Sequence, residues 1–256
     1  MKRALSVLAP LVLLALLLGV WELACRMLAV PAYLLPPPSA IAQAFLGQRA
    51  ALMVSAWNTL SMAMAALALA TAIALPLALA TALSPILERA LAPIAVTLQV
   101  TPVVAIAPLV VIWAGLDHPE RAITTLAAVV AFFPIFSGSL AGLKSADRDL
   151  ERLFDLYGAG RIQRLLRLRL PAAVPFVLEG LKVAAGLSII GAVVAEFVAG
   201  SGGAQGLAWR ILEAGNRLRT AEMFAALATL GVLGAAVYAL LQVAEKRLLA
   251  LWRGRD

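Results

Sequence analysis

Charged residues are missing from four long stretches of this chain. No Asp, Glu, Lys or Arg occurs in 50–87, 90–116, 122–143 or 223–244, and the first of these runs is 38 residues long. Charged residues make up 14% of the sequence and hydrophobic residues 63%, whereas soluble domains contain about 25% charged residues. A helix needs about 20 apolar residues to cross the hydrocarbon core of a bilayer. The composition therefore excludes a soluble fold and predicts a chain that crosses the membrane several times.

The chain is also poor in residues that perform catalysis or bind metals. It has one cysteine, Cys25, and one histidine, His118, so neither an internal disulfide nor a Cys/His metal site is expected. We expect Cys25 to be a packing residue and His118 to be solvated. The sequence lacks a G-x-x-x-x-G-K-[ST] phosphate loop and a catalytic set of residues at membrane depth, which predicts no ATP hydrolysis by this chain and disfavours a membrane enzyme.

The apolar runs are continuous rather than alternating, which favours helices over barrel strands. We expect an all-α bundle, with residues 1–256 forming a single transmembrane domain whose first span is not cleaved. The six predicted spans are Leu5–Leu28, Ser55–Leu83, Leu91–Leu116, Ala122–Leu143, Pro175–Ala199 and Ala221–Ala244.

The net charge of +7 lies in the segments between these spans, a distribution typical of membrane orientation rather than of nucleic-acid binding. With the N-terminus inside, 15 of the 21 Lys and Arg residues are cytoplasmic. The positive-inside rule therefore predicts that both termini are cytoplasmic. The six external cations are Arg26, Arg49, Arg121, Arg210, Arg217 and Arg219.

Small residues recur at four-residue spacing, which places them on one helix face. They are Ala66, Ala70, Ala74, Ala78 and Ala82 in the second span, and Gly138 and Gly142 in the fourth. Such faces let membrane helices approach closely. We favour packing within the chain over a subunit interface.

Prolines interrupt two regions. Pro93, Pro102 and Pro108 break the third span around Gln99 and Thr101, and broken backbone at membrane depth is tolerated when it is buried or lines a cavity. Both a translocation-path wall and a kinked packing helix remain open. In the first external connector, three prolines precede Ser39, which we expect to cap a short helix starting near Ala40.

The longest polar segment, about 144–174, is predicted to be cytoplasmic. Leu150, Leu153, Phe154 and Tyr157 form an apolar stripe at i, i+3, i+4 and i+7, and Gly158 offers a helix end. A second, basic helical stretch follows, which we expect Pro171 and Pro175 to end before the next span. A short amphipathic helix must lie on the membrane, fold onto the bundle or enter a groove of a partner.

Gly158 followed after nine residues by Leu168-Arg169-Leu170-Pro171 resembles the cytoplasmic signature of binding-protein-dependent ABC transporter permeases. The usual opening Glu-Ala-Ala is replaced here by Arg152-Leu153-Phe154, and Leu168 stands where Ile is usual. Further segments resemble the branch that imports sulfonates, taurine, nitrate and pyrimidine-type precursors. These segments are Trp21-Glu22-Leu23, Leu35-Pro36-Pro37-Pro38-Ser39-Ala40, Pro108-Leu109, Trp113-Ala114-Gly115-Leu116, Phe133-Pro134-Ile135 and Ala195-Glu196-Phe197-Val198-Ala199-Gly200.

The resemblance implies a type I importer permease in the bacterial inner membrane, with a second permease copy, an ABC ATPase subunit and a periplasmic solute-binding protein as partners. ATP and Mg would be bound by the ATPase, so no cofactor is expected in this chain. The implied coupling site for the ATPase comprises Leu150, Leu153, Phe154, Tyr157, Gly158, Ala159, Leu168, Leu170 and Pro171. ATP-driven closure of the ATPases would turn the spans through this site.

For two sets of charged residues the sequence leaves more than one role open. Glu196 is the one charged residue between Lys182 and Arg210, in the fifth span, where an isolated charge costs about 2.5–3.5 kcal/mol. It is a candidate for the translocation path together with Gln99 and Thr101, although a packing carboxylate near the external end is favoured. The external Arg210, Arg217 and Arg219 would contact a binding protein, attract anions or be merely solvated.

Two competing functions remain besides an ABC importer permease. An ion-gradient-driven secondary transporter usually has several ionisable residues within its spans and two repeated halves. In this chain Glu196 is the one clear ionisable residue at membrane depth, and no internal repeat is visible. A non-transporting membrane assembly factor is the third hypothesis.

Overall fold

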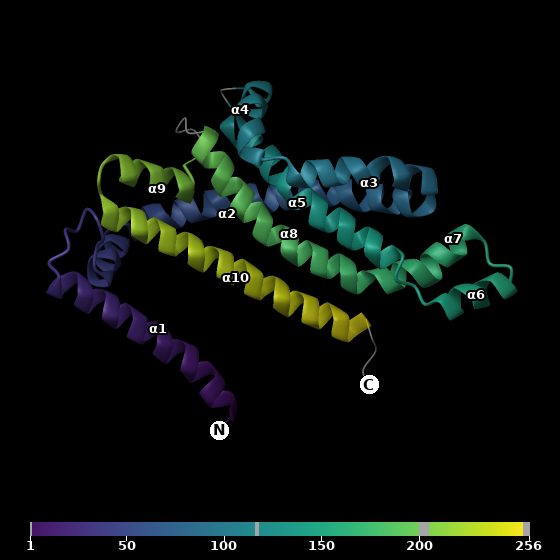
Figure 1. Ribbon diagram of the computed structural model, residues 1–256, viewed down its shortest axis with the longest axis horizontal. Coiled ribbons are helices and arrows are strands. Elements are labelled where there is room, and N and C mark those ends of the chain that lie inside the picture. The colour runs from purple at the N-terminus through teal and green to yellow at the C-terminus, as the bar shows by residue number, and fades with distance from the viewer. Residues whose placement is uncertain (1, 116–117, 200–204, 253–256) are drawn as a thin grey trace. The chain divides into compact units, whose positions relative to one another are not determined.

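The computed structural model describes residues 2–115, 118–199 and 205–252, and the regular elements in this part of the chain are helices (Figure 1). They are α1 (Lys2–Met27), α2 (Pro38–Leu83), α3 (Pro85–Val100), α4 (Val103–Ala114), α5 (Pro119–Leu143), α6 (Arg148–Leu156), α7 (Arg161–Arg164), the π-helix η1 (Leu165–Arg169), α8 (Leu170–Ala199), α9 (Leu207–Asn216) and α10 (Thr220–Trp252). The chain divides into two compact units. The first comprises Met1–Trp57 and Gln205–Gly231, and the second Asn58–Ala204 and Val232–Asp256.

Five helical segments are long and apolar enough to cross a membrane, which confirms five of the six predicted spans. They are Leu8–Met27, Pro38–Leu83, Pro119–Leu143, Arg161–Ala199 and Thr220–Ala250. The remaining predicted span, Leu91–Leu116, consists of two shorter helices, α3 and α4, and the break between them agrees with the interruption that its prolines predict. Of these two, α4 is an apolar helix of 12 residues, too short to cross alone. The predicted end at Leu116 lies outside the described residues.

The third span breaks at Thr101 and Pro102 for a local reason. Pro102 lacks the N–H that would continue the helix, and it drives the residue before it out of the helical region. Thr101 accordingly has φ −70° and ψ 124°. The Thr101 hydroxyl donates to the Thr97 carbonyl at 2.7 Å, which satisfies the side chain at the end of α3. Pro93 and Pro108 remain inside helices.

The second span begins much earlier than predicted, because α2 is one helix of 46 residues. It starts at Pro38, where a missing N–H costs nothing. Ser39 therefore lies within α2 rather than capping a short helix, and the prediction of its capping role is wrong. The Ser39 backbone N–H and hydroxyl donate instead to the Glu22 carboxylate of α1, at 3.0 and 2.8 Å.

In the first unit, polar and aromatic contacts fix the C-terminal end of α1. Arg26 pairs with Glu22 one turn away at 2.6 Å. The rings of Trp21 and Phe224 meet edge to face with centroids 5.9 Å apart, a favoured aromatic geometry. Cys25 is buried, which confirms it as a packing residue.

In the second unit, α5 and α8 lie side by side along their lengths (Figure 1). Their contact consists of small residues on both helices. A Cβ added to Gly180 would lie 2.8 Å from the Pro134 carbonyl oxygen, and one added to Gly191 would lie 2.8 Å from the Cα of Ala127. The two backbones therefore approach as closely as glycine allows.

The small faces predicted from the sequence pack within the chain. Ala66, Ala70, Ala74 and Ala78 are fully buried, and Ala82 contacts the buried cluster of Leu143, Leu165 and Ala173. A Cβ on Gly138 or Gly142 would press against α8, at Phe176 in both cases. These observations confirm intramolecular packing.

Gly180→Ala and Gly191→Ala should each destabilise the protein. The added methyl group meets backbone at 2.8 Å in both cases, and overpacking of this kind costs about 1–3 kcal/mol. Gly186→Ala is the matched control on the same helix, since its Cβ meets nothing within 4 Å and Gly-to-Ala in a helix gains about 0.5–1 kcal/mol. Thermal unfolding midpoints in detergent measure the difference. Equal midpoints for all three variants would contradict the tight α5–α8 contact.

Candidate functional site in the loop between α5 and α8

The loop carries the amphipathic helix that the sequence predicts. Helix α6 begins after Asp147, whose side chain accepts a hydrogen bond from the Asp149 N–H at 2.7 Å, as expected of an N-cap. It ends at Gly158, which has φ +64°. The Gly158 N–H donates to the Asp155 carbonyl at 3.0 Å and the Ala159 N–H to the Phe154 carbonyl at 2.9 Å. This pair of bonds is a Schellman motif, and it confirms Gly158 as the helix end.

The apolar stripe of α6 remains largely uncovered. Leu150 and Leu153 are 45% and 43% exposed and Tyr157 is 83% exposed, while Phe154 is half-buried. Leu156, which lies outside the predicted stripe, is 85% exposed. The nine-residue helix therefore presents an uncovered apolar stripe, a feature that often marks interaction sites.

Ion pairs join α6 to the helices that follow it. Glu151 of α6 accepts a hydrogen bond from Arg169 of η1 at 2.7 Å and also faces Arg164 of α7 at 3.9 Å. Arg164 pairs in addition with Asp155 and donates to the Ala159 carbonyl at 3.2 Å. The side chains of Glu151, Arg164 and Arg169, which form the middle of this ion-pair network, are each at least half-buried. The network joins α6 to α7 and η1 through their side chains.

The loop element joins α8 through the π-helical turn η1 rather than through a helix end. The prediction that Pro171 and Pro175 end the basic stretch is wrong, because α7, η1 and α8 form one helical run. In η1 the Leu170 N–H reaches back to the Leu165 carbonyl. The wider turn accommodates a residue that an α-helix would not, and Pro171 follows it in the first turn of α8, where a missing N–H is tolerated.

The remaining predicted coupling residues divide between surface and core. Leu168 is buried, whereas Leu170 is exposed and Pro171 half-buried. Leu168 and Leu165 of η1 both face inward. Leu170 borders an apolar cavity of about 470 Å³ together with Leu143, Ala173 and Val177. Leu168 is thus a buried residue and is not part of the exposed apolar stripe of α6.

The three candidate path residues do not share one environment. Gln99 is exposed near the end of α3, and Thr101 is half-buried at the break after it. Glu196 of α8 is 3% exposed, and the Thr59 hydroxyl donates to its carboxylate at 3.4 Å. A buried carboxylate with a hydroxyl partner is the arrangement expected of a packing residue. Gly200-Ser201-Gly202-Gly203, next to it in sequence, lies outside the described residues.

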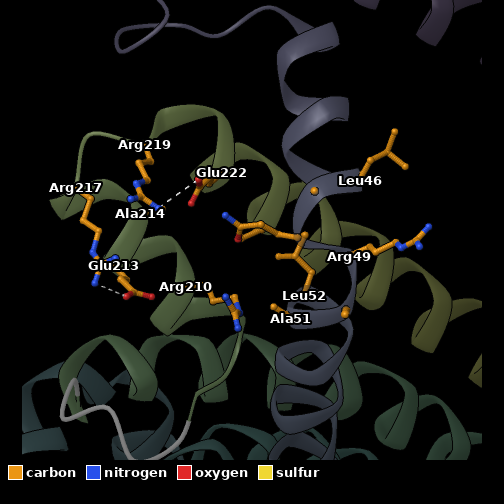
Figure 2. A pocket seen from close by; sticks show the side chains of 14 residues that line it. Leu46, Arg49, Ala51, Leu52, Arg210, Glu213, Ala214, Arg217, Arg219 and Glu222 are labelled. Atoms are coloured by element: carbon orange, nitrogen blue, oxygen red, sulfur yellow. Dashed lines mark ion pairs between the residues drawn. The ribbon is translucent and has the colours of Figure 1, made fainter.

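The first unit contains a charged cleft that the sequence did not reveal (Figure 2). It has a volume of about 620 Å³ and lies between α2 and α9 at the start of α10. Its charged lining residues are Arg49, Arg210, Glu213, Arg217, Arg219 and Glu222. Three of these arginines are the external cations singled out in the sequence, but Glu213 and Glu222 were not recognised as their neighbours. A signal was present, since Glu213 and Arg217 are four residues apart.

Within residues 2–115, 118–199 and 205–252, no group of three or more His, Cys, Asp and Glu residues is placed to hold a metal ion. The His118 imidazole is half-exposed and lies 3.1 Å from the Glu120 carboxylate.

These features define a polytopic helical membrane protein with an ion-paired, apolar-faced helical element in one loop. The chain belongs to the family described as "Binding-protein-dependent transport system inner membrane component", whose sequence pattern matches residues 70–250. The matched region includes α6, η1 and the break between α3 and α4. The chain is accordingly the permease subunit of an ABC importer. The alternative hypothesis of an ion-gradient-driven secondary transporter is not supported.

Several characterised permeases are similar over nearly the whole chain. The formylaminopyrimidine transport permease protein ThiX of Halalkalibacterium halodurans is 33% identical and covers 100% of both chains. The riboflavin transport system permease protein RibX of Chloroflexus aurantiacus is 36% identical over 94% of this chain and 88% of its own. The taurine transport system permease protein TauC of Escherichia coli is 29% identical over the same shares, 94% and 88%.

Glu151→Gln should loosen α6 from η1. Removing the central carboxylate leaves Arg169 without its partner, and we expect amide exchange in α6 to rise by about 5- to 30-fold, the factor that corresponds to about 1–2 kcal/mol. Hydrogen exchange followed by mass spectrometry measures this. Arg152→Gln is the control, because the Arg152–Asp149 pair is highly exposed and such pairs contribute about 0–1 kcal/mol. Unchanged exchange in Glu151→Gln would show that the network does not hold the element together.

Proposed function

We propose that this chain lines the path of an importer for a small water-soluble solute and that its loop element receives mechanical work from a separate ATPase. The observation that carries the proposal is the uncovered apolar stripe of α6 on an ion-paired element, within the region matched by the permease family. An apolar knob on a rigid support transmits displacement, because packed interfaces switch between discrete states. ATP and Mg bind to the ATPase, and the chain itself is not an enzyme.

The proposed solute belongs to the range of the named relatives. These are named as transport permeases for formylaminopyrimidine, riboflavin and taurine. The sequence resemblance favours a sulfonate, taurine, nitrate or a pyrimidine-type compound, and the riboflavin permease extends this range to larger heteroaromatic compounds. We further propose two copies of this chain in a homodimer and a periplasmic solute-binding protein as the donor of the solute, in a bacterial inner membrane.

Reconstitution tests the whole assignment. Proteoliposomes that contain this chain, its ATPase and its binding protein should accumulate solute only when ATP is supplied on the ATPase side. Omission of the ATPase should abolish uptake, since the chain has no phosphate loop of its own. Uptake by the chain alone, driven by an ion gradient, would overturn the proposal.

Leu153→Asp and Phe154→Asp should uncouple transport without preventing membrane insertion. Each places a charge on the stripe of α6 that is proposed to enter a groove of the ATPase, and burying an unpaired charge is costly. We expect ATPase association in a pull-down to weaken about tenfold or more, the effect of losing an interface hot spot. Arg148→Asp, on the opposite and polar face of α6, is the matched control. Normal association by both stripe variants would refute the coupling role.

The proposed orientation places α6 in the cytoplasm and the connection between α9 and α10 outside. One cysteine, Cys25, makes a cysteine-free background available through Cys25→Ser. In that background, Leu218→Cys should react with a membrane-impermeant thiol reagent in intact cells, whereas Leu156→Cys should react only after permeabilisation. Both positions are highly exposed, at 73% and 85%. The reverse pattern would invert the topology.

A further inference from the structure

Arg210 is distinguished from the other arginines of the cleft by its partners. Arg217 pairs with Glu213 at 3.0 Å and Arg219 with Glu222 at 3.6 Å. Arg49 extends on the side of α2 that faces away from α9 (Figure 2). In the described part of the chain, no carboxylate pairs with Arg210. The cleft therefore contains one half-buried cation whose charge its neighbours do not neutralise.

The guanidinium of Arg210 is fixed in place by a neutral group. Its Nε donates to the Ser55 hydroxyl at 2.5 Å, and Ser55 is 0% exposed. Figure 2 shows the side chain between α9 and α2, beside Ala51 and Leu52. A guanidinium has five N–H donors, and the bond to Ser55 uses the one on Nε. The two terminal nitrogens have no hydrogen-bond acceptor among the described residues.

We propose that this cleft is a binding site for a small oxyanion, with Arg210 as the residue that binds it. The planar guanidinium matches a sulfonate, carboxylate or phosphate group through two parallel hydrogen bonds. The lining has four arginines and two glutamates, a net charge of +2, so the cleft attracts anions even though Glu213 and Glu222 lie on it. Its volume of about 620 Å³ falls within the range of small-molecule sites, about 300–1,000 Å³.

Two sources supply such an oxyanion on the proposed outer side of the membrane. One is the acidic group of a solute such as a sulfonate, and the other is the phosphate of a lipid headgroup. The anion affinity of the cleft does not depend on the proposed transport function, whereas the solute as its source rests on that function. The experiment therefore uses both kinds of anion.

The test is titration of the purified full-length protein in a neutral detergent. Methanesulfonate, taurine, inorganic phosphate and a short-chain phosphatidylglycerol are added separately, and binding is followed by calorimetry. Wild type should bind at least one of them, and Arg210→Gln should weaken that binding by about 10- to 100-fold, as expected for loss of a charge-assisted hydrogen bond. Arg217→Gln, which removes an arginine already paired with Glu213, should change it by less than about threefold.

A second variant separates binding from folding. Arg210→Lys keeps the charge and the fold of the cleft but loses the planar fork, so it should bind more weakly than wild type and more tightly than Arg210→Gln. Binding of the sulfonates identifies a solute-type ligand, and binding of the phosphatidylglycerol alone identifies a lipid headgroup; both support the site. Three results would overturn the proposed anion site. They are no anion binding by the wild type, an equal loss of anion affinity in the Arg210 and Arg217 variants, and a defect of Arg210→Gln that is confined to capture of the solute-binding protein. A pull-down of the ATPase by Arg210→Gln should be normal, which keeps this result independent of the coupling proposal.

Discussion

The close approach of α5 and α8 fixes the position of everything between them. Gly142 is the second-last residue of α5, and a Cβ there would lie 2.9 Å from the Cα of Ala173, close to the loop's other end. The two ends of the segment 144–174 are therefore held together by backbone contact. Leu143, Leu165 and Ala173 form a buried cluster directly beneath this contact. A displacement of the loop must consequently be transmitted to both helices, because neither end can move without the other.

Lipid as the surrounding solvent explains where the chain places its charges. Lys182 of α8 is largely buried, and it pairs with Glu245 of α10 at 2.9 Å and also with Glu179. Glu196 has Thr59 beside it. Charges within spans are expensive unless they are partnered, and these groups satisfy that requirement inside the protein. The helix faces left outside, such as that of α1, are aliphatic and need no partner within the chain.

The sequence predicts those features whose cause is local. Runs of apolar residues predict the spans, the four-residue spacing of Ala66–Ala78 predicts a buried face, and Gly158 predicts the end of α6. The errors arise where distant groups decide the outcome. Ser39 has the chemistry of a cap, but Glu22 is nearby in space and competes for its hydroxyl. Pro171 has the chemistry of a helix breaker, but the π-turn before it absorbs the strain.

The candidate site shows the same limit more sharply. The apolar stripe of α6 can be read from spacing, whereas the bond between Glu151 and Arg169 depends on the π-turn that brings Arg169 beside α6. Likewise Arg210 and Ser55 are 155 residues apart in sequence. No periodicity relates such a pair.

The two candidate sites differ in how they use charge. In the loop element, Glu151, Asp155, Arg164 and Arg169 satisfy one another, so recognition by the uncovered apolar stripe of α6 depends on shape and desolvation. In the cleft of the first unit, Ser55 holds Arg210 without neutralising it, so recognition there depends on charge. Salt weakens attraction to exposed charges but has little effect on apolar burial. The number of cations in the sequence cannot distinguish the loop element from the cleft. An arginine has a charge available for a ligand only where no carboxylate pairs with it, and that depends on the folded structure.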